Sequence, residues 1–275
     1  MWIKRKPKEK TLQVEDISNS PKSKEQIMRE QIEEGEEMYG TSGRSVFISS
    51  LSAGLEVGFS FFLIAILHTH FAGEMDSKSI FFMTAFAYPI GFILVVLGKS
   101  ILFTEQTSLL TLPVLNRKRS LGELLKIWGI VLLGNLLGGY IITFLVLWIG
   151  TAMNMIELES VREIAHHVSS PKPFVIFGSA VLAGWLMGLL SWLVTSSQET
   201  ISRILIIYLI TTLIGIGGLH HSIVGSIEVF AGLISDSDTT FLDYLSFQVV
   251  ATLGNAIGGV VFVALLKYRA FASNF

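Results

Sequence analysis

Two adjacent histidines, His220 and His221, stand in an apolar stretch where a helix in a bilayer carries neither by preference. The stretch reads LIGIGGLHHSIVG, and glycines at 215, 217 and 218 precede the histidines. Near the middle of a membrane, an imidazole can donate a hydrogen bond to an anion or, once protonated, offer it a full positive charge. The pattern therefore indicates anion or proton handling. The structural alternative for His221 is a buried histidine bonded to a carbonyl group.

A second polar segment, GKSILFTEQTSLL at 98–110, carries Lys99 inside another apolar stretch. A lysine within a membrane span is costly unless it is paired or faces water. Its candidate ion-pair partners are Glu56, Glu105 and Glu228. An unpaired Lys99 would attract anions, a paired one would be part of the scaffold, and the sequence leaves both interpretations open. Lys99, His220 and the three glutamates are also compatible with proton-coupled transport.

Composition places both segments in a membrane protein. Hydrophobic residues make up 51% of the chain and charged residues only 15%, which lies outside the range of ordinary soluble domains. No cysteine is present, so disulfides and thiolate metal sites are excluded. We expect a lipid bilayer around the chain, no nucleic-acid partner, no metal, no cofactor and no catalytic residues.

Six apolar runs long enough to cross a bilayer occur, at about 46–67, 80–115, 127–150, 174–195, 204–234 and 246–266.

The polar flanks define the domain organisation. Residues 1–44 read as a tail whose first 22 residues look disordered and whose segment KEQIMREQIEEGEEMYG is a possible surface helix. Residues 45–268 form the six-span domain, and 269–275 form the C-terminal end. Of the 20 lysines and arginines, 16 fall on the side of the N-terminus, three on the opposite side, and Lys99 lies within a span. The positive-inside rule then predicts that both termini are cytoplasmic.

The chain also repeats itself at an offset of 120 residues. LGNLLGG begins at Leu133 in the third apolar run, and LGNAIGG begins at Leu253 in the sixth. Two related halves of three spans each must enter the bilayer from opposite sides, which gives a 3+3 inverted repeat. The interrupted runs are the second and the fifth. Broken helices in hydrocarbon are tolerated only where protein or a watery cavity satisfies the freed backbone groups, so we predict a pathway between the two breaks.

The ordered set of motifs, with LFTEQT in the second run, HSI after a glycine-rich break in the fifth, and GN..GG in the third and sixth, resembles the formate/nitrite transporter family. The resemblance covers about residues 45–268 and is greatest to the YfdC-like branch of the family. It implies an all-α integral membrane fold that is aquaporin-like. It also implies homopentamers of six-span protomers, each protomer with its own pore for small monovalent anions or their conjugate acids.

The resemblance further implies roles for individual residues. His221 would be the central pore histidine, with Thr104 as its partner from the second run. Lys99 and His220 depart from the family pattern. The remaining expected pathway residues are Leu102 and Phe103 in an apolar narrowing, and Tyr88 and Ile214 at the cytoplasmic constriction.

We therefore expect a bacterial inner-membrane channel or transporter for small monovalent anions or weak acids, and not an enzyme. Two alternatives remain open. One is a channel for neutral solutes, or a cation-tolerant path, in which the carboxylates line the lumen. The other is a structural or regulatory pentamer whose protomer pores are closed by an ion pair of Lys99.

Overall fold

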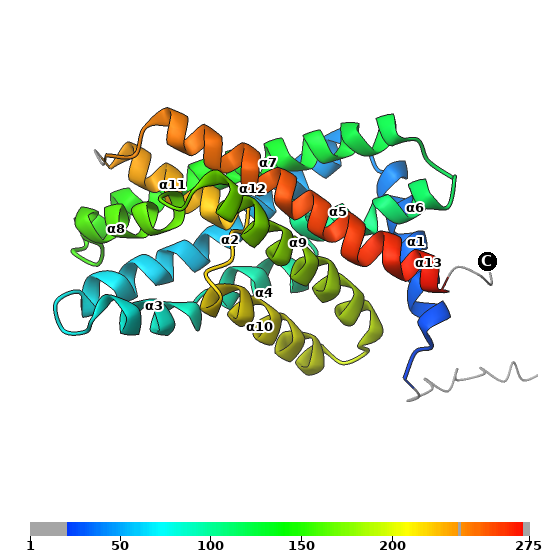
Figure 1. The fold of residues 1–275 in the computed structure, drawn as a ribbon, viewed down its shortest axis with the longest axis horizontal. Helices are drawn as coiled ribbons and strands as arrows, with labels where there is room; N and C mark the ends of the chain where they lie inside the picture. Colours follow the sequence, from blue (N-terminus) through cyan, green and yellow to red (C-terminus); the bar gives the residue numbers. More distant parts are fainter. Residues whose placement is uncertain (1–20, 236–237, 272–275) are drawn as a thin grey trace, which may run out of the picture.

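The computed structural model describes residues 21–235 and 238–271, and within these ranges the chain contains no β-strand. Residues 1–20 of the expected tail and 272–275 of the expected C-terminal end lie outside the described residues. The elements in chain order are α1 (Lys24–Gly40), α2 (Gly43–Phe71), α3 (Ser77–Ala85), α4 (Pro89–Leu97), α5 (Phe103–Leu109), α6 (Thr111–Leu115), α7 (Leu121–Ala152), α8 (Leu158–Ser169), α9 (Pro173–Ser196), α10 (Thr200–Ile216), α11 (Val224–Ile234), α12 (Phe241–Gly259), the π-helix η1 (Val260–Leu265) and α13 (Leu266–Phe271). Helices α3 and α8 lie at one end of the bundle, and α1, α6 and α13 lie at the other (Figure 1).

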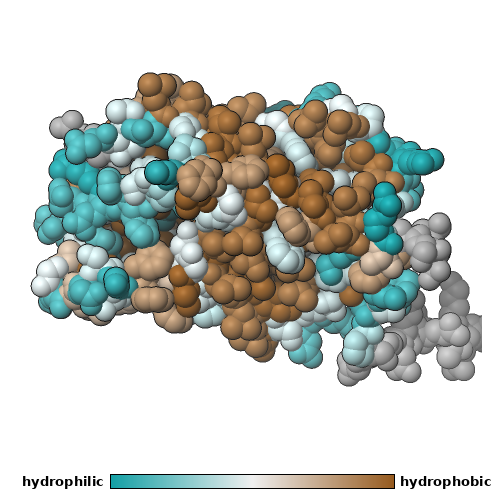
Figure 2. Space-filling view, viewed as in Figure 1, coloured by the Kyte–Doolittle hydropathy of each residue, from teal (hydrophilic) through white to brown (hydrophobic). Residues whose placement is uncertain are grey.

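Apolar helices cross the molecule between these two ends. Five segments are long and apolar enough to span a bilayer, namely α2, α3 with α4, α7, α9, and α12 continued through α13. Helices α10 and α11 are shorter and apolar, and together they make the sixth crossing. A band of apolar surface separates two hydrophilic ends (Figure 2), as the hydrocarbon core of a bilayer requires. The chain is a multi-pass membrane protein, and the predicted all-α, six-span fold is confirmed.

The second and fifth crossings are interrupted, as predicted. Helix α4 ends at Leu97 and α10 ends at Ile216, and the chain is not α-helical again until α5 and α11 begin. Two residues after each of these ends the backbone takes a positive φ, 60° at Lys99 and 56° at Gly218. This left-handed conformation suits glycine and is unfavourable for residues with a Cβ. Lys99 is therefore the geometric counterpart of Gly218 in the other half.

In each half, the first and third crossings pack through glycines at matching positions. A Cβ at Gly54 of α2 would overlap the backbone of α7, and one at Gly138 of α7 would overlap the backbone of α2. The same holds for Gly184 of α9 and Gly258 of α12. Small residues let two helix backbones touch, which is how helices associate tightly in membranes. The repeated sequence thus builds two equivalent helix pairs, α2 with α7 and α9 with α12, and gives the predicted 3+3 repeat.

The segment KEQIMREQIEEGEEMYG forms α1, which begins with a capping box. The Ser23 hydroxyl accepts from the backbone N–H of Gln26 at 3.2 Å, and the Gln26 side chain accepts from the backbone N–H of Ser23 at 2.8 Å. The buried face of this helix contains Ile27, Met28 and Ile32, and it packs against apolar residues of α6, α9 and η1. Helix α1 is therefore docked on the membrane domain along one face.

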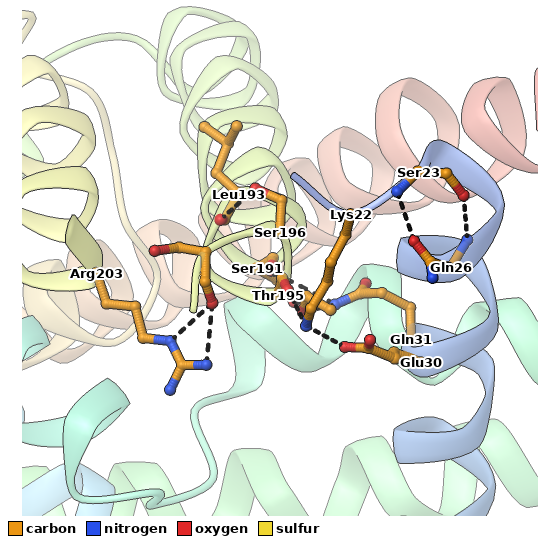
Figure 3. Close-up of polar contacts among 11 residues, drawn as sticks. Lys22, Ser23, Gln26, Glu30, Gln31, Ser191, Leu193, Thr195, Ser196 and Arg203 are labelled. Carbon is orange, nitrogen blue, oxygen red and sulfur yellow. Dashed lines mark hydrogen bonds and ion pairs between the residues drawn. The ribbon is translucent and has the colours of Figure 1, made fainter. Parts of the chain in front are cut away.

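Polar contacts fix the position of α1 against the end of α9 (Figure 3). The buried Gln31 amide donates to the hydroxyls of Ser191 at 3.2 Å and Thr195 at 2.6 Å. Lys22 donates to the carbonyl of Thr195 at 2.8 Å and forms an ion pair with Glu30. These contacts place the acidic face of α1 next to the first break.

Candidate functional site

One asparagine of the repeated motif holds the first break in place. Asn135 of α7 is fully buried, and its Oδ1 accepts the backbone N–H of Phe103 at 2.8 Å. Its Nδ2 donates to the carbonyl oxygens of Ser50 at 2.7 Å and Ile101 at 2.9 Å. Because unpaired backbone groups inside a bilayer cost several kcal/mol, this amide replaces hydrogen bonds that the broken helix has lost.

The second asparagine repeats the arrangement in the other half. Asn255 of α12 accepts the backbone N–H of Ser222 at 2.7 Å. It donates to the carbonyl oxygens of Ala180 at 2.8 Å and His220 at 3.0 Å. The LGN motif indicated internal repetition in the sequence, but it did not indicate this bracing role. The sequence feature that indicates this bracing role is an asparagine that recurs at equivalent depths of two apolar helices.

The two braced breaks meet at Thr104 and His221. Thr104 Oγ1 lies 2.7 Å from His221 Nε2, and both residues are almost completely buried. His221 Nδ1 accepts the backbone N–H groups of Ile223 and Val224, each at 3.3 Å. With two donors at Nδ1, the neutral ring carries its proton on Nε2 and donates it to the threonine oxygen. The threonine hydroxyl proton is then available to a further acceptor.

Apolar groups surround this pair. The ring of Phe92 meets the His221 ring edge-on at a centroid distance of 5.0 Å, a contact that sequence reasoning missed. Leu102 is fully buried directly before Phe103 at the start of α5. The Phe103 ring packs edge-on against Trp128 of α7 at 5.9 Å. Phe103, one of the two residues expected in the apolar narrowing, therefore packs its ring against α7.

A cavity of about 1550 Å³ opens towards the end of the molecule that holds α3 and α8. This α8-side cavity reaches from Lys78 and Arg162 near its mouth down to His221. Tyr88, from the turn between α3 and α4, and Ile214 of α10 line it. The resemblance had implied that these two residues lie at the cytoplasmic constriction, on the side of the N-terminus. The structure places them on the cavity away from α1.

A smaller pocket of about 320 Å³ lies on the side of α1. Lys99 and Arg203 line this α1-side pocket together with acidic residues of α1 and α5, namely Glu30, Glu34, Glu37 and Glu105. The Lys99 side chain is exposed and forms no ion pair within 4.0 Å with any described residue. Desolvation within the pocket, together with the neighbouring Glu37 and Glu30 carboxylates, raises the pKa of Glu34 on α1, while Lys99 lowers it.

The three glutamates proposed as partners of Lys99 have other surroundings. Glu56 accepts from the hydroxyls of Ser52 at 2.7 Å and Ser100 at 3.0 Å. Glu105 lines the α1-side pocket without a short contact to the lysine, and Glu228 lines the α8-side cavity. None of the three candidate ion pairs of Lys99 is therefore formed among the described residues. The left-handed turn at Lys99 leads its side chain into an open pocket rather than towards Glu56.

His220 is the histidine that is fixed by a carbonyl group. Its Nε2 donates to the carbonyl of Val168 at 3.1 Å, and its Nδ1 accepts from the Ser179 hydroxyl at 2.8 Å. A bond to a carbonyl group was the structural alternative for His221, but the residue that makes such a bond is His220. Among residues 21–235 and 238–271, no three histidine, aspartate or glutamate side chains gather into a group that would hold a metal ion.

Comparisons with known proteins agree with this architecture. The family model described as Formate/nitrite transporter matches residues 25–269. The chain is 28% identical to the inner membrane protein YfdC of Escherichia coli, over 99% of this chain and 87% of that protein. A solved structure described as an FNT family ion channel has a TM-score of 0.80 at 25% identity, over 89% of this chain and 98% of that one. A pentameric formate channel with formate bound has a TM-score of 0.69 at 20% identity, over 84% and 98%, and shows the shared fold.

The family match extends over both broken crossings, both bracing asparagines and the Thr104–His221 pair. Its members are membrane channels and transporters rather than enzymes. The chain belongs to the formate/nitrite transporter family.

Proposed function

We propose that the protein conducts small monovalent anions, of the kind that formate and nitrite represent, or their conjugate acids. In this proposal the Thr104–His221 pair is the central polar group of the pathway. The observation that carries it is the 2.7 Å contact between these side chains, at the point where the two helix breaks meet and at the floor of the α8-side cavity.

The pair supplies what an anion needs at a dehydrated point. An anion that enters an apolar region loses hydration worth many kcal/mol. A threonine hydroxyl, oriented by an imidazole N–H, donates a hydrogen bond at that point. A protonated imidazole would add a full charge, and its proton could convert the anion into its neutral acid. Leu102 and Phe92 would keep water away from the pair, which strengthens these interactions because the local dielectric is low.

Lys99 and Arg203 would serve the opposite mouth of the pathway. Both are cationic and line the α1-side pocket, and Lys99 has no ion-pair partner among the described residues. Unpaired cations in a narrow pocket raise the local concentration of anions. This favours the attracting role of Lys99 over a plug made by its ion pair. The glutamates that line the same pocket oppose this effect, and of these only Glu30 is paired within the described part of the chain, with Lys22.

The assembly and its orientation belong to the same proposal. The pentameric formate channel with a similar fold supports a homopentamer in which each protomer carries its own pathway. The YfdC relative supports a bacterial inner membrane, and the distribution of lysine and arginine supports cytoplasmic termini. The α1-side pocket would then face the cytoplasm and the α8-side cavity the outside.

Flux into liposomes tests the proposal. The full chain is reconstituted, and formate and nitrite uptake is measured by light scattering at external pH values from 5 to 8. We expect saturable uptake that rises as the external pH falls. Uptake of glycerol or urea without formate or nitrite would instead favour the neutral-solute channel. If none of these four solutes is taken up while native mass spectrometry finds an intact pentamer, the structural role would be favoured.

A further inference from the structure

Glu228 is an acidic residue within the α8-side cavity whose role the Thr104–His221 pair does not explain. It lies on α11, seven residues after His221 and three after Gly225, and all three residues line the cavity. Gly225 and Glu228 are three residues apart within α11 and share one face of that helix, whereas His221 precedes the helix. Side chains on a helix lean towards its N-terminus, so the Glu228 carboxyl group leans towards the end of α11 that follows His221, and both residues line the same cavity.

Because the Glu228 carboxyl group is buried, it needs a hydrogen-bond or ion-pair partner. The residue is only 7% exposed. Its carboxyl oxygens have no hydrogen-bond or ion-pair partner within the described part of the chain, whereas one oxygen of Glu56, Oε1, accepts from two hydroxyls. An isolated carboxylate is expensive to bury, whereas a neutral carboxylic acid is a hydrogen-bond donor. Since the group faces the cavity, its partner must come from the cavity contents.

Lys78 of α3 is exposed at the mouth of the cavity, whereas Arg162 and His68, which also line it, are already engaged. Arg162 of α8 donates to the carbonyl of Ser235 at 3.0 Å and pairs with Glu159 at 3.1 Å. His68 of α2 lies 3.6 Å from Glu163. Burial and the neighbouring His166 lower the pKa of His167 on α8. None of these groups forms an ion pair with Glu228 in the described part of the chain.

The other titratable groups near α11 are neutral or acidic. Tyr88 and Asp243 line the same cavity. Tyr140 of α7 bonds to Tyr244 of α12, which also lies 2.9 Å from the Ser226 hydroxyl. His220 has both ring nitrogens occupied. An anion in this cavity therefore meets a carboxyl group that is not neutralised, and two negative charges in a low dielectric repel strongly.

We propose that Glu228 is a proton donor for the transported anion, an inference that rests on the function proposed above. The O–H bond of the Glu228 carboxylic acid breaks, and its proton forms a bond to an oxygen of the monovalent anion. The neutral acid moves on towards His221. The Glu228 carboxylate then regains a proton from hydronium in the cavity, so that one proton travels with each anion.

The test compares Glu228→Gln with the wild type in liposomes that contain a pH dye and a potential-sensitive dye. The matched control is Glu74→Gln, which changes an exposed acidic residue at the same end of the molecule, outside the cavity. For the wild type and the control we expect formate uptake to acidify the lumen by about one proton per formate. For Glu228→Gln we expect proton-coupled uptake to fall at least 10-fold, and any remaining flux to carry charge.

Several outcomes would overturn the inference. An unchanged proton-to-formate ratio and rate in Glu228→Gln would do so, and so would wild-type formate flux that carries charge without protons. In both cases the proposed function would stand. A wild type that moves neither formate nor nitrite would overturn both proposals.

A second measurement uses the wild-type chain, in case the glutamine variant does not fold. Dicyclohexylcarbodiimide reacts with protonated carboxyl groups in apolar surroundings. We expect mass spectrometry to find Glu228 modified, formate flux to be lost, and excess formate to slow both. A chain that loses no activity, or that carries no modification at Glu228, contradicts the proposal.

Discussion

Thr104 Oγ1 and His221 Nε2 lie 2.7 Å apart although 117 residues separate the two side chains in the chain. Each residue sits beside a helix break, and each break is held by its own buried asparagine. The contact therefore depends on the correct association of the two halves of the repeat. Variants of Thr104 and His221 change the chemistry of this contact, whereas variants of the asparagines change the scaffold that positions it. The two kinds of effect can therefore be measured separately.

Removing the hydroxyl at position 104 should reduce flux without unfolding the protein. Thr104→Val keeps the shape of the side chain but loses the donor and acceptor, so we expect formate uptake to fall at least 10-fold. Thr104→Ser keeps the hydroxyl and should retain most of the activity. Liposome uptake of both variants, matched for protein content, checks this. Equal uptake by the valine and serine variants would remove the threonine from the mechanism.

Replacement of the central histidine should be equally damaging. His221→Ala removes the N–H that orients Thr104, and we expect uptake to fall at least 10-fold. His70→Ala is the control, because His70 is exposed and lies outside both cavities. Light-scattering uptake assays at pH 5 and pH 7 compare the two. If His221→Ala transports like His70→Ala at both pH values, the central role is wrong.

The bracing asparagines should matter for stability more than any other amide. Asn135→Ala and Asn255→Ala each leave three buried backbone groups without partners, at about 1 kcal/mol or more apiece. We expect the Tm in detergent to fall by roughly 6 °C or more. Asn116→Ala loses one hydrogen bond, to Tyr268, and should change the Tm by less than half as much. Fluorescence-detected size exclusion after heating provides the measurement. Similar Tm values for all three variants would contradict the bracing role.

Glycines at the helix contacts should not tolerate alanine. The added Cβ in Gly138→Ala would overlap the backbone of α2, and in Gly258→Ala that of α9, so each helix pair must separate. We expect both variants to lose most of the folded protein. Gly129→Ala and Gly178→Ala are matched controls on α7 and α9, since nothing lies within 4 Å of a Cβ there, and they should be neutral or slightly stabilising. Folded yield in detergent separates the two groups.

Lys99 should affect flux and stability in opposite directions. Its φ of 60° costs a residue with a Cβ about 1 kcal/mol, so Lys99→Gly should raise the Tm by about 2–4 °C. The loss of its charge should lower anion uptake a few-fold in both Lys99→Gly and Lys99→Gln at low ionic strength. The difference from the wild type should shrink as salt shortens the Debye length from about 30 Å to 10 Å. Uptake that increases on replacement would instead support a lysine that blocks the pathway.

The docking of α1 should depend on pH through Glu34. Glu34 keeps an exposed fraction, but desolvation within the α1-side pocket raises its pKa, so the docked state binds the proton more tightly than the undocked state does. Docking should therefore be strongest below pH 4.5, weaken as the pH rises through the raised value, and stay constant above it. Hydrogen exchange of α1, corrected for the intrinsic rate, measures this at pH 4.5 and 7. The dependence should vanish in Glu34→Gln and persist in Glu33→Gln, which changes an exposed residue of α1 outside the pocket. Equal exchange protection of the wild type at the two pH values would contradict it.

The amino-acid sequence by itself determined the fold class, the six crossings, the repeat and the two breaks. Apolar runs of membrane length, interrupted by glycine and polar residues, have few alternatives, because a bilayer leaves no backbone group without a partner. The LGN repeat likewise fixed which helices correspond. These features follow from composition and periodicity along a single segment, where no distant contact is needed.

Only the tertiary structure decided which polar groups meet. It brought Thr104 to His221, gave the carbonyl-bound role to His220, and placed Tyr88 and Ile214 on the cavity away from α1. It also left Lys99 without the ion pair that three nearby glutamates made plausible, since the left-handed turn at residue 99 leads its side chain into the α1-side pocket. The physical reason is that the position of a residue along a membrane span determines its depth in the bilayer. The partner of a polar side chain depends instead on how its helix is rotated about the helix axis. That rotation is set by glycine contacts and asparagine bridges between segments far apart in the chain.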